Sequence, residues 1–137
     1  MTTLLRFAAL AAVLVVAMGC GNTTSSSAPT LSGTSWTIVS INRFPTVATA
    51  QPTADFGADG KVSGNAGCNT YNGTYTVTGD NITVSPLIST RIACASADIT
   101  TQEGAFLEAL SRATHWSIDQ GNLSLTGFKN IVGSPKT

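Results

Sequence analysis

Apolar and polar residues alternate along most of the chain after residue 30, with the two-residue period of a β-strand. In the first such stretch, "TSWTIVSIN" (34–42), Trp36, Ile38 and Ser40 share one face, and Val39 and Ile41 share the other. Both faces are partly apolar, which predicts a strand that is covered on each side.

Three pairs of alternating segments are separated by short turn signals and predict β-hairpins. "TADF" and "KVSGNA" flank Asp59-Gly60, a dipeptide whose residues tolerate positive φ. "GTYTVTGDNITVS" turns at 79–81, and "HWSIDQGNLSLTG" turns at 120–122. A last short strand is predicted over 128–132.

One segment, "DITTQEGAFLEALSRAT" (98–114), has the spacing of a helix instead. Its apolar stripe consists of Phe106, Leu107, Leu110 and Ala113. Thr100 and Glu103 fit a capping box at the helix start, and Arg112 falls in the last turn, where a cation suits the helix dipole. The chain is therefore predicted to be an α+β domain of antiparallel hairpins that curl into a closed or partly open barrel, with one helix packed on it.

The N-terminus has the pattern of a bacterial lipoprotein signal. In "MTTLLRFAALAAVLVVAMGC", Arg6 precedes a short apolar run that ends at Gly19 and Cys20. Residues 1–19 are predicted to be a signal peptide and Cys20 the lipidated mature N-terminus. Residues 20–30, "CGNTTSSSAPT", would be a flexible tether, and 31–137 the folded domain. An ordinary cleaved signal is the alternative. We expect an exported protein, lipid-anchored to the bacterial cell membrane, with its domain outside the cytoplasm.

The other two cysteines, Cys68 and Cys94, then lie in an exported domain, where disulfides are favoured. A bridge between them would stabilise the fold by roughly 3 kcal/mol on the chain-entropy estimate. A free thiol pair is the alternative. A zinc site is disfavoured because structural sites need four ligands and His115 is the only histidine. We expect no metal and no cofactor.

The charges and the absence of catalytic motifs narrow the function classes. The chain has seven Lys and Arg residues together, and seven Asp and Glu residues together. Arg6 would be removed with the signal peptide. The mature chain is close to neutral with no basic run, which disfavours nucleic-acid binding. No nucleophile motif accompanies His115, and the carboxylates fit turns and helix positions, so no catalytic residue and no enzymatic activity are expected.

The order of these signals resembles the META domain of the HslJ family, bacterial envelope proteins. The resemblance covers Leu31 to Val132, and its most specific segments are "GNAGCNTYNGTY" (64–75) and "TRIAC" (90–94). It implies a cracked barrel with a helix and a Cys68–Cys94 disulfide. Such proteins are tied to heat stress, antibiotic tolerance, motility and virulence, and no enzymatic activity defines the family.

A small recognition site is the less favoured of two interpretations of the region where the two motifs meet. Glycines around Cys68 allow a sharp bend, and Asn69 can hold such a bend by bonding to nearby backbone groups. Asn69, Tyr71, Thr90 and Arg91 are the candidate recognition residues. The alternative is that this patch is only scaffold.

The expected function is that of a monomeric, non-enzymatic accessory or stress-related lipoprotein. It would hold the membrane by its N-terminal lipid and dock on another envelope protein. The alternative is a binder of an apolar small molecule or lipid in the barrel interior, near Phe106, Leu110 and Trp116. A domain with no partner of its own is a third possibility.

Overall fold

The computed structural model describes residues 27–137, so the predicted signal peptide (1–19) and Cys20 lie outside the described residues. Within this part of the chain no helix is long and apolar enough to cross a membrane. The strands are β1 (Thr34–Ile41), β2 (Phe44–Pro45), β3 (Thr53–Phe56), β4 (Lys61–Asn65), β5 (Thr70–Thr78), β6 (Asn81–Val84), β7 (Ile88–Ser89), β8 (Ala113–Asp119), β9 (Asn122–Gly127) and β10 (Ile131–Pro135). A short 3-10 helix, η1, spans Ala48–Ala50, and the α-helix α1 spans Ala97–Ser111.

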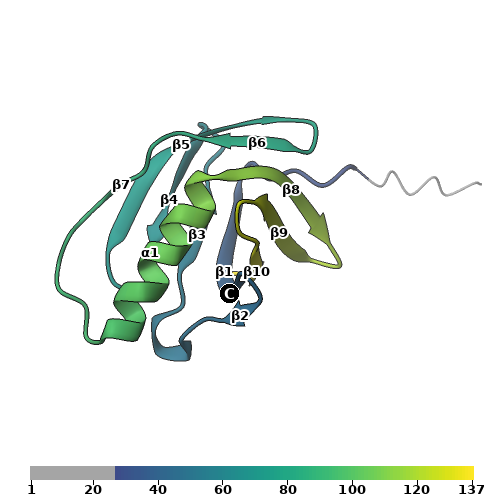
Figure 1. The fold of residues 1–137 in the computed structure, drawn as a ribbon. Helices are drawn as coiled ribbons and strands as arrows, with labels where there is room; N and C mark the ends of the chain where they lie inside the picture. The colour runs from purple at the N-terminus through teal and green to yellow at the C-terminus, as the bar shows by residue number, and fades with distance from the viewer. Residues whose placement is uncertain (1–26) are drawn as a thin grey trace, which may run out of the picture.

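Eight of the strands form an antiparallel barrel, drawn in Figure 1. The ring runs β1-β3-β4-β5-β6-β8-β9-β10 and closes where β10 pairs with β1. Two short strands lie outside the ring, because β2 pairs with β1 and β7 pairs with β5. The predicted α+β barrel of hairpins with one helix is confirmed.

The barrel is most weakly joined between β6 and β8, where a single residue pair, Asn81 with His115, connects the strands. Trp116 reinforces this seam: its backbone N–H donates to Asp80 O at 2.9 Å, and its indole Nε1 donates to Gly79 O at 3.0 Å. The strands therefore form a closed ring whose pairing is nearly interrupted at the junction of β6 and β8.

The helix α1 packs against the barrel and contributes three side chains to its core. Phe106, Ala109 and Leu110 are buried and belong to the same hydrophobic cluster as the inward side chains of the strands. The ring of Phe106 meets that of Tyr71 edge-on, with centroids 5.5 Å apart. All of the core lies between Leu31 and Ile131, so a chain that begins at Ala28 contains every residue of the folded domain.

Strand β1 departs from strict alternation, which corrects the predicted placement of Ile41. The pairing of β1 with β10 shifts register between Ile38 and Ser40, at a β-bulge. Because the bulge adds one residue, the residues after it face the opposite side from the one that strict alternation predicts. Ile41 is therefore buried on the same side as Trp36 and Ile38.

The helix also begins earlier than predicted. Ser96 is the N-cap, and its Oγ accepts a hydrogen bond from Ile99 N at 3.3 Å. Thr100 lies inside the helix, and its hydroxyl donates back to Ser96 O at 3.1 Å. The predicted capping box is wrong, and Glu103 is free for another role. Arg112 is the C-cap residue just beyond the last helical turn.

The three predicted hairpin turns are present. Gly60, Gly79 and Gly121 all have positive φ, as turn geometry of this type requires. The last strand, β10, runs three residues past the predicted end.

Candidate functional site: a stapled surface loop

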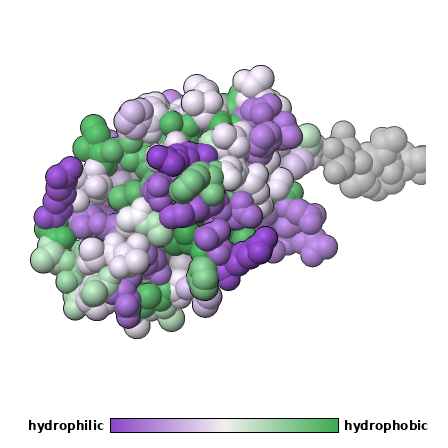
Figure 2. Space-filling view, viewed as in Figure 1, coloured by the Kyte–Doolittle hydropathy of each residue, from purple (hydrophilic) through white to green (hydrophobic). Residues whose placement is uncertain are grey.

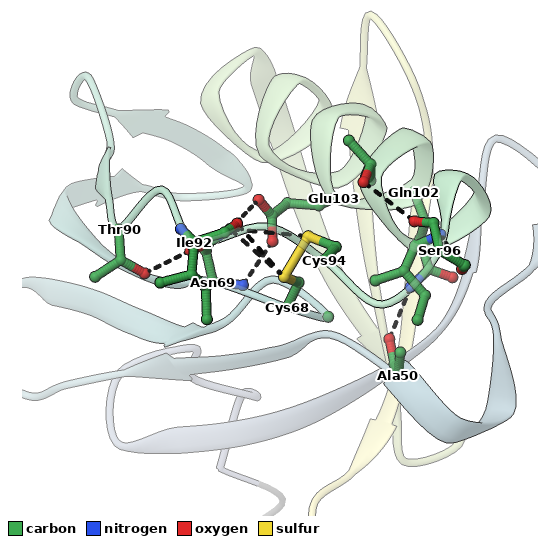
Figure 3. The surroundings of a disulfide bond; sticks show 12 residues. Ala50, Cys68, Asn69, Thr90, Ile92, Cys94, Ser96, Gln102 and Glu103 are labelled. Atoms are coloured by element: carbon green, nitrogen blue, oxygen red, sulfur yellow. Dashed lines mark hydrogen bonds between the residues drawn. A yellow bond between two sulfur atoms is a disulfide. The ribbon is translucent and has the colours of Figure 1, made fainter.

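Cys68 and Cys94 form a disulfide that joins two distant parts of the chain. Cys68 follows β4, and Cys94 lies in the segment between β7 and α1. The Cα atoms are 5.7 Å apart, within the usual range for a bridge. The disulfide fixes residues 90–96, which lead into the helix, against the start of β5 (Figure 3).

Asn69 is the only polar residue among the described part of the chain that is buried, at 3% exposure. Its Oδ1 accepts hydrogen bonds from Thr90 Oγ1 and from Ile92 N, both at 2.8 Å. Its Nδ2 donates to Ile92 O at 3.2 Å and to Glu103 Oε1 at 2.8 Å. The sequence predicts that Asn69 holds the bend in its own segment. In the structure its side chain holds the backbone of the opposite segment instead.

Glu103 supports Asn69 from the helix. One carboxylate oxygen accepts from Asn69 N at 2.6 Å, and the other accepts from Asn69 Nδ2 at 2.8 Å. Both donors are part-buried, where hydrogen bonds to a charged acceptor are stronger than neutral ones. Glu103 thereby selects the amide orientation in which Asn69 Oδ1 faces the loop, as Figure 3 shows.

A second clamp comes from the neighbouring helix residue. Gln102 Oε1 accepts from Val47 N at 2.6 Å, and Gln102 Nε2 donates to Ala50 O at 2.7 Å. Close by, Gly67 has a φ of +109°, and a Cβ there would come 2.9 Å from Ala50 O. The bend before Cys68 therefore requires glycine, and α1 is tied to η1 and to the stapled loop by adjacent residues.

The stapled loop presents large side chains to solvent. Ile92 is 66% exposed although its backbone N–H and C=O are both bonded to Asn69. Ile88, on β7, is 71% exposed, and Arg91 is also exposed. A shallow pocket of about 330 Å³ lies beside Arg91 and Ile92, and Thr90 and Glu103 are among its other lining residues. We call Ile88, Arg91 and Ile92 the loop surface.

Three of the four predicted recognition residues come together here. Asn69, Thr90 and Arg91 all line the pocket beside the disulfide. Tyr71 does not: it is 2% exposed, and its hydroxyl donates to Thr53 O at 2.8 Å inside the barrel. Burial raises the pKa of the Tyr71 phenol, and the charge of Asp55 adds to the rise. Its place in a recognition patch is wrong because the alternation of β5 turns Tyr71 inward.

Glu103 and Ile92 were missed by sequence reasoning. Glu103 was assigned to a capping box that the structure does not contain, and Ile92 was read only as part of a motif. The exposure of Ile92 has no signal in the sequence, because it depends on how the loop packs against Asn69.

The sulfur and carboxylate groups beside the loop are engaged in bonds within the domain. Cys68, Cys94 and Glu103 place their ligand atoms within 4.8 Å of one another, but the two sulfurs are bonded to each other. His115 is exposed on β8, where its Nδ1 lies 3.0 Å from the hydroxyl of Thr114.

Comparisons with known proteins agree with this architecture. An NMR structure of a protein from Burkholderia xenovorans superposes with a TM-score of 0.66 at 24% identity, covering 78% of this chain and 84% of that one. A second NMR structure gives 0.63 at 20% identity, with 75% and 89% covered. A crystal structure of a DUF4847 family protein from Bacteroides vulgatus gives 0.52 at 16% identity, with 74% and 92% covered.

These similarities establish the fold, because the identities are low. No curated protein matches the chain in sequence. The model of the META domain family, in contrast, matches residues 29–132, which include the barrel, the helix and the stapled loop. The chain belongs to the META domain family.

Proposed function

We propose that this protein is a non-enzymatic, membrane-anchored envelope lipoprotein, accessory or stress-related in role, that docks on another envelope protein through the loop surface. The observation that carries the proposal is the contrast at Ile92. Its backbone is held at both polar atoms by buried Asn69, while two thirds of its side chain faces solvent.

Such a loop suits binding because its conformation is fixed before the partner arrives. Ordering the backbone of a mobile loop costs roughly 1–2 kcal/mol for each residue, and a loop whose backbone is already fixed avoids that cost. Arginine is also enriched among the residues that dominate interface energies. Arg91 and the exposed Ile92 line the same pocket and therefore provide an apolar side chain beside a charged one.

Figure 2 shows hydrophobic and hydrophilic atoms intermixed over the face that bears α1, without one broad apolar area. A small, pre-organised contact fits such a surface better than a wide apolar interface does.

The alternative, an apolar ligand in the barrel interior, has less support. Phe106 and Leu110 are completely buried in the core, and Trp116 packs against that core from the seam between β6 and β8. The predicted binding space near these three residues is occupied by the side chains themselves.

The membrane anchor is supported by the lipoprotein-like sequence that ends at Cys20. Figure 1 shows that residues 27–30 leave the barrel on one side of the molecule, whereas β7 and its connection to α1 lie on the other. An anchored domain would thus direct the loop surface away from its point of attachment.

Photo-crosslinking in intact cells tests the docking. Benzoylphenylalanine in place of Ile92 should give a covalent adduct with a second protein, and an additional Arg91→Ser change should reduce its yield. The same probe in place of Phe44, which is 72% exposed at another part of the surface, is the control and should give none. Equal adducts at both positions, or none at position 92, would contradict the proposal.

A separate experiment tests the anchor. The Cys20→Ser variant should no longer incorporate labelled palmitate and should leave the membrane fraction. If it stays membrane-bound, the N-terminal lipid is not the anchor, and the docking result stands by itself.

A further inference from the structure

A second cleft lies on a different part of the surface, between α1 and the turn that joins β1 to β2. It has a volume of about 360 Å³, at the lower end of typical ligand sites. Its apolar lining comes from Ile41 in the floor, Phe44 and Val47 on one wall, and Ala105 on the helix wall. Phe44 stands on the rim with 72% of its surface exposed.

The turn beside this cleft is held in an uncommon conformation. Asn42 and Arg43 are consecutive non-glycine residues with positive φ, 50° and 71°. Such residues cost free energy and persist where the surroundings fix them. Asn42 N donates to Asn130 O at 2.6 Å, which ties the turn to the loop between β9 and β10 and brings Asn42 close to Lys129.

The basic and acidic residues of the cleft line different parts of it. Lys129 and Asn42 line one part of the cleft. Asp98 lines the helix wall at seven residues before Ala105, which corresponds to roughly 10 Å along the axis. Hydrogen-bond donors and an acidic group are therefore separated by an apolar floor.

Lys129 shares its carboxylate partner with a second cation. Its Nζ lies 2.7 Å from Glu108 Oε2, which uses one of its three N–H donors. Arg112 also approaches Glu108, at 3.8 Å, and its guanidinium lies 4.7 Å from the centroid of the Phe128 ring. Two cations thus share Glu108, and two N–H donors of Lys129 remain for another acceptor.

We propose that this cleft binds a single-chain amphiphile with an anionic head group, of the fatty-acid class. The alkyl chain lies over Ile41 and Ala105, and the head group accepts hydrogen bonds from Lys129 and Asn42. Asp98 excludes the reverse orientation, because it would face the anion. This site is separate from the loop surface and does not depend on docking there.

A titration of the domain from Ala28 to Thr137 with sodium decanoate, below its critical micelle concentration, tests the site. Amide resonances of Ile41, Phe44 and Ala105 should shift and saturate, while those of Phe106 and Leu110 stay unchanged. Decyltrimethylammonium, with the same chain and the opposite charge, should bind at least about tenfold more weakly. Equal binding of both detergents, no saturable shift, or shifts centred on Phe106 would overturn the proposal.

Two variants with matched controls localise the effect. Ala105→Leu fills the cleft and should abolish the shifts, whereas Ala97→Leu, at an exposed helix position outside it, should not. Lys129→Met should weaken decanoate binding by about tenfold, whereas Lys61→Met, on β4, should have no effect. Unchanged binding in Ala105→Leu and Lys129→Met would place the ligand elsewhere and overturn the assignment.

Vesicles of phosphatidylcholine with phosphatidylglycerol distinguish the source of such a chain. The same local shifts with decanoate and with vesicles would identify a bilayer lipid, and shifts with decanoate alone would identify a free fatty acid. Both outcomes support the cleft. Binding to vesicles without any binding of decanoate would mean that this surface contacts a membrane as a whole, and the cleft assignment would be wrong.

Discussion

Glu103 holds Asn69 at two points, with one carboxylate oxygen on the backbone N–H and the other on the side-chain amide. This arrangement connects the helix to the stapled loop, because Asn69 in turn bonds to both polar backbone atoms of Ile92. The position of the loop surface therefore depends on a carboxylate that lies on another element.

Replacing that carboxylate should destabilise the domain. Glu103→Gln keeps the shape but turns an NH₂ group toward one of the two donors, and we expect a loss of about 1–3 kcal/mol in the free energy of unfolding. Urea denaturation measures it. Asp98→Asn, on the same helix and exposed, is the control and should change stability by less than about 0.5 kcal/mol. Similar small effects for both variants would show that the Asn69 contact is not needed.

The disulfide should contribute a comparable amount. Cys68 and Cys94 are 26 residues apart, for which the chain-entropy model gives roughly 3 kcal/mol. We expect the Cys68→Ala/Cys94→Ala variant to unfold at lower urea, and a reductant to lower the midpoint of the wild type but not that of the variant. A reductant that leaves the wild type unchanged would contradict a stabilising bridge in the native protein.

Tyr71 should resist ionisation as long as the barrel is folded. Burial holds the pKa of its phenol above the ordinary value of 10.0. Because the folded-state pKa is the higher one, the associated stability is present below about pH 10 and is lost as the pH rises above it. In Tyr75→Phe, where Tyr71 is the one tyrosine left, phenolate absorbance should appear only together with loss of the folded circular dichroism signal. Phenolate formation in the folded protein near pH 10 would argue against burial.

Glu108 should titrate below its usual range. The hydrogen bond from Lys129 lowers the pKa of Glu108 from 4.5, and the charges of Lys129 and Arg112 add to this effect. Stability from this group is present above that value and is lost as the pH falls through the lower folded-state pKa. Carboxyl ¹³C NMR should show the pKa rising in Lys129→Met and unchanged in Lys61→Met. An equal pKa in Lys129→Met and wild type would rule out the ion pair in solution.

Local patterns of the sequence were sufficient for the hairpins and for the existence of the helix. The turns at Gly60, Gly79 and Gly121 follow from residues that accept positive φ, and the stripe around Phe106 and Leu110 follows from helical spacing. These features depend on neighbours in the chain, so they can be deduced without tertiary information.

Features that depend on distant partners could not be deduced. Ile41 faces the core because of a bulge opposite β10, and alternation alone assigns it to the wrong face. Glu103 looked like a capping residue, and its role appears only when Asn69 arrives from β5. Tyr71 lies in the motif that carries the family resemblance, yet the same strand that exposes Asn72 turns Tyr71 inward.

The central claim is that the backbone of the stapled loop is fixed while its side chains are presented to solvent, and amide hydrogen exchange at Ile92 tests it most directly. In the folded domain the Ile92 N–H should exchange slowly despite its place at the surface, because it donates to Asn69 Oδ1 at 2.8 Å. The neighbouring Arg91 N–H is the internal reference and should exchange fast. Asn69→Ala should bring Ile92 to the same fast rate. Rapid exchange of the Ile92 amide in the wild type would contradict a pre-organised loop and, with it, the docking surface proposed for this domain.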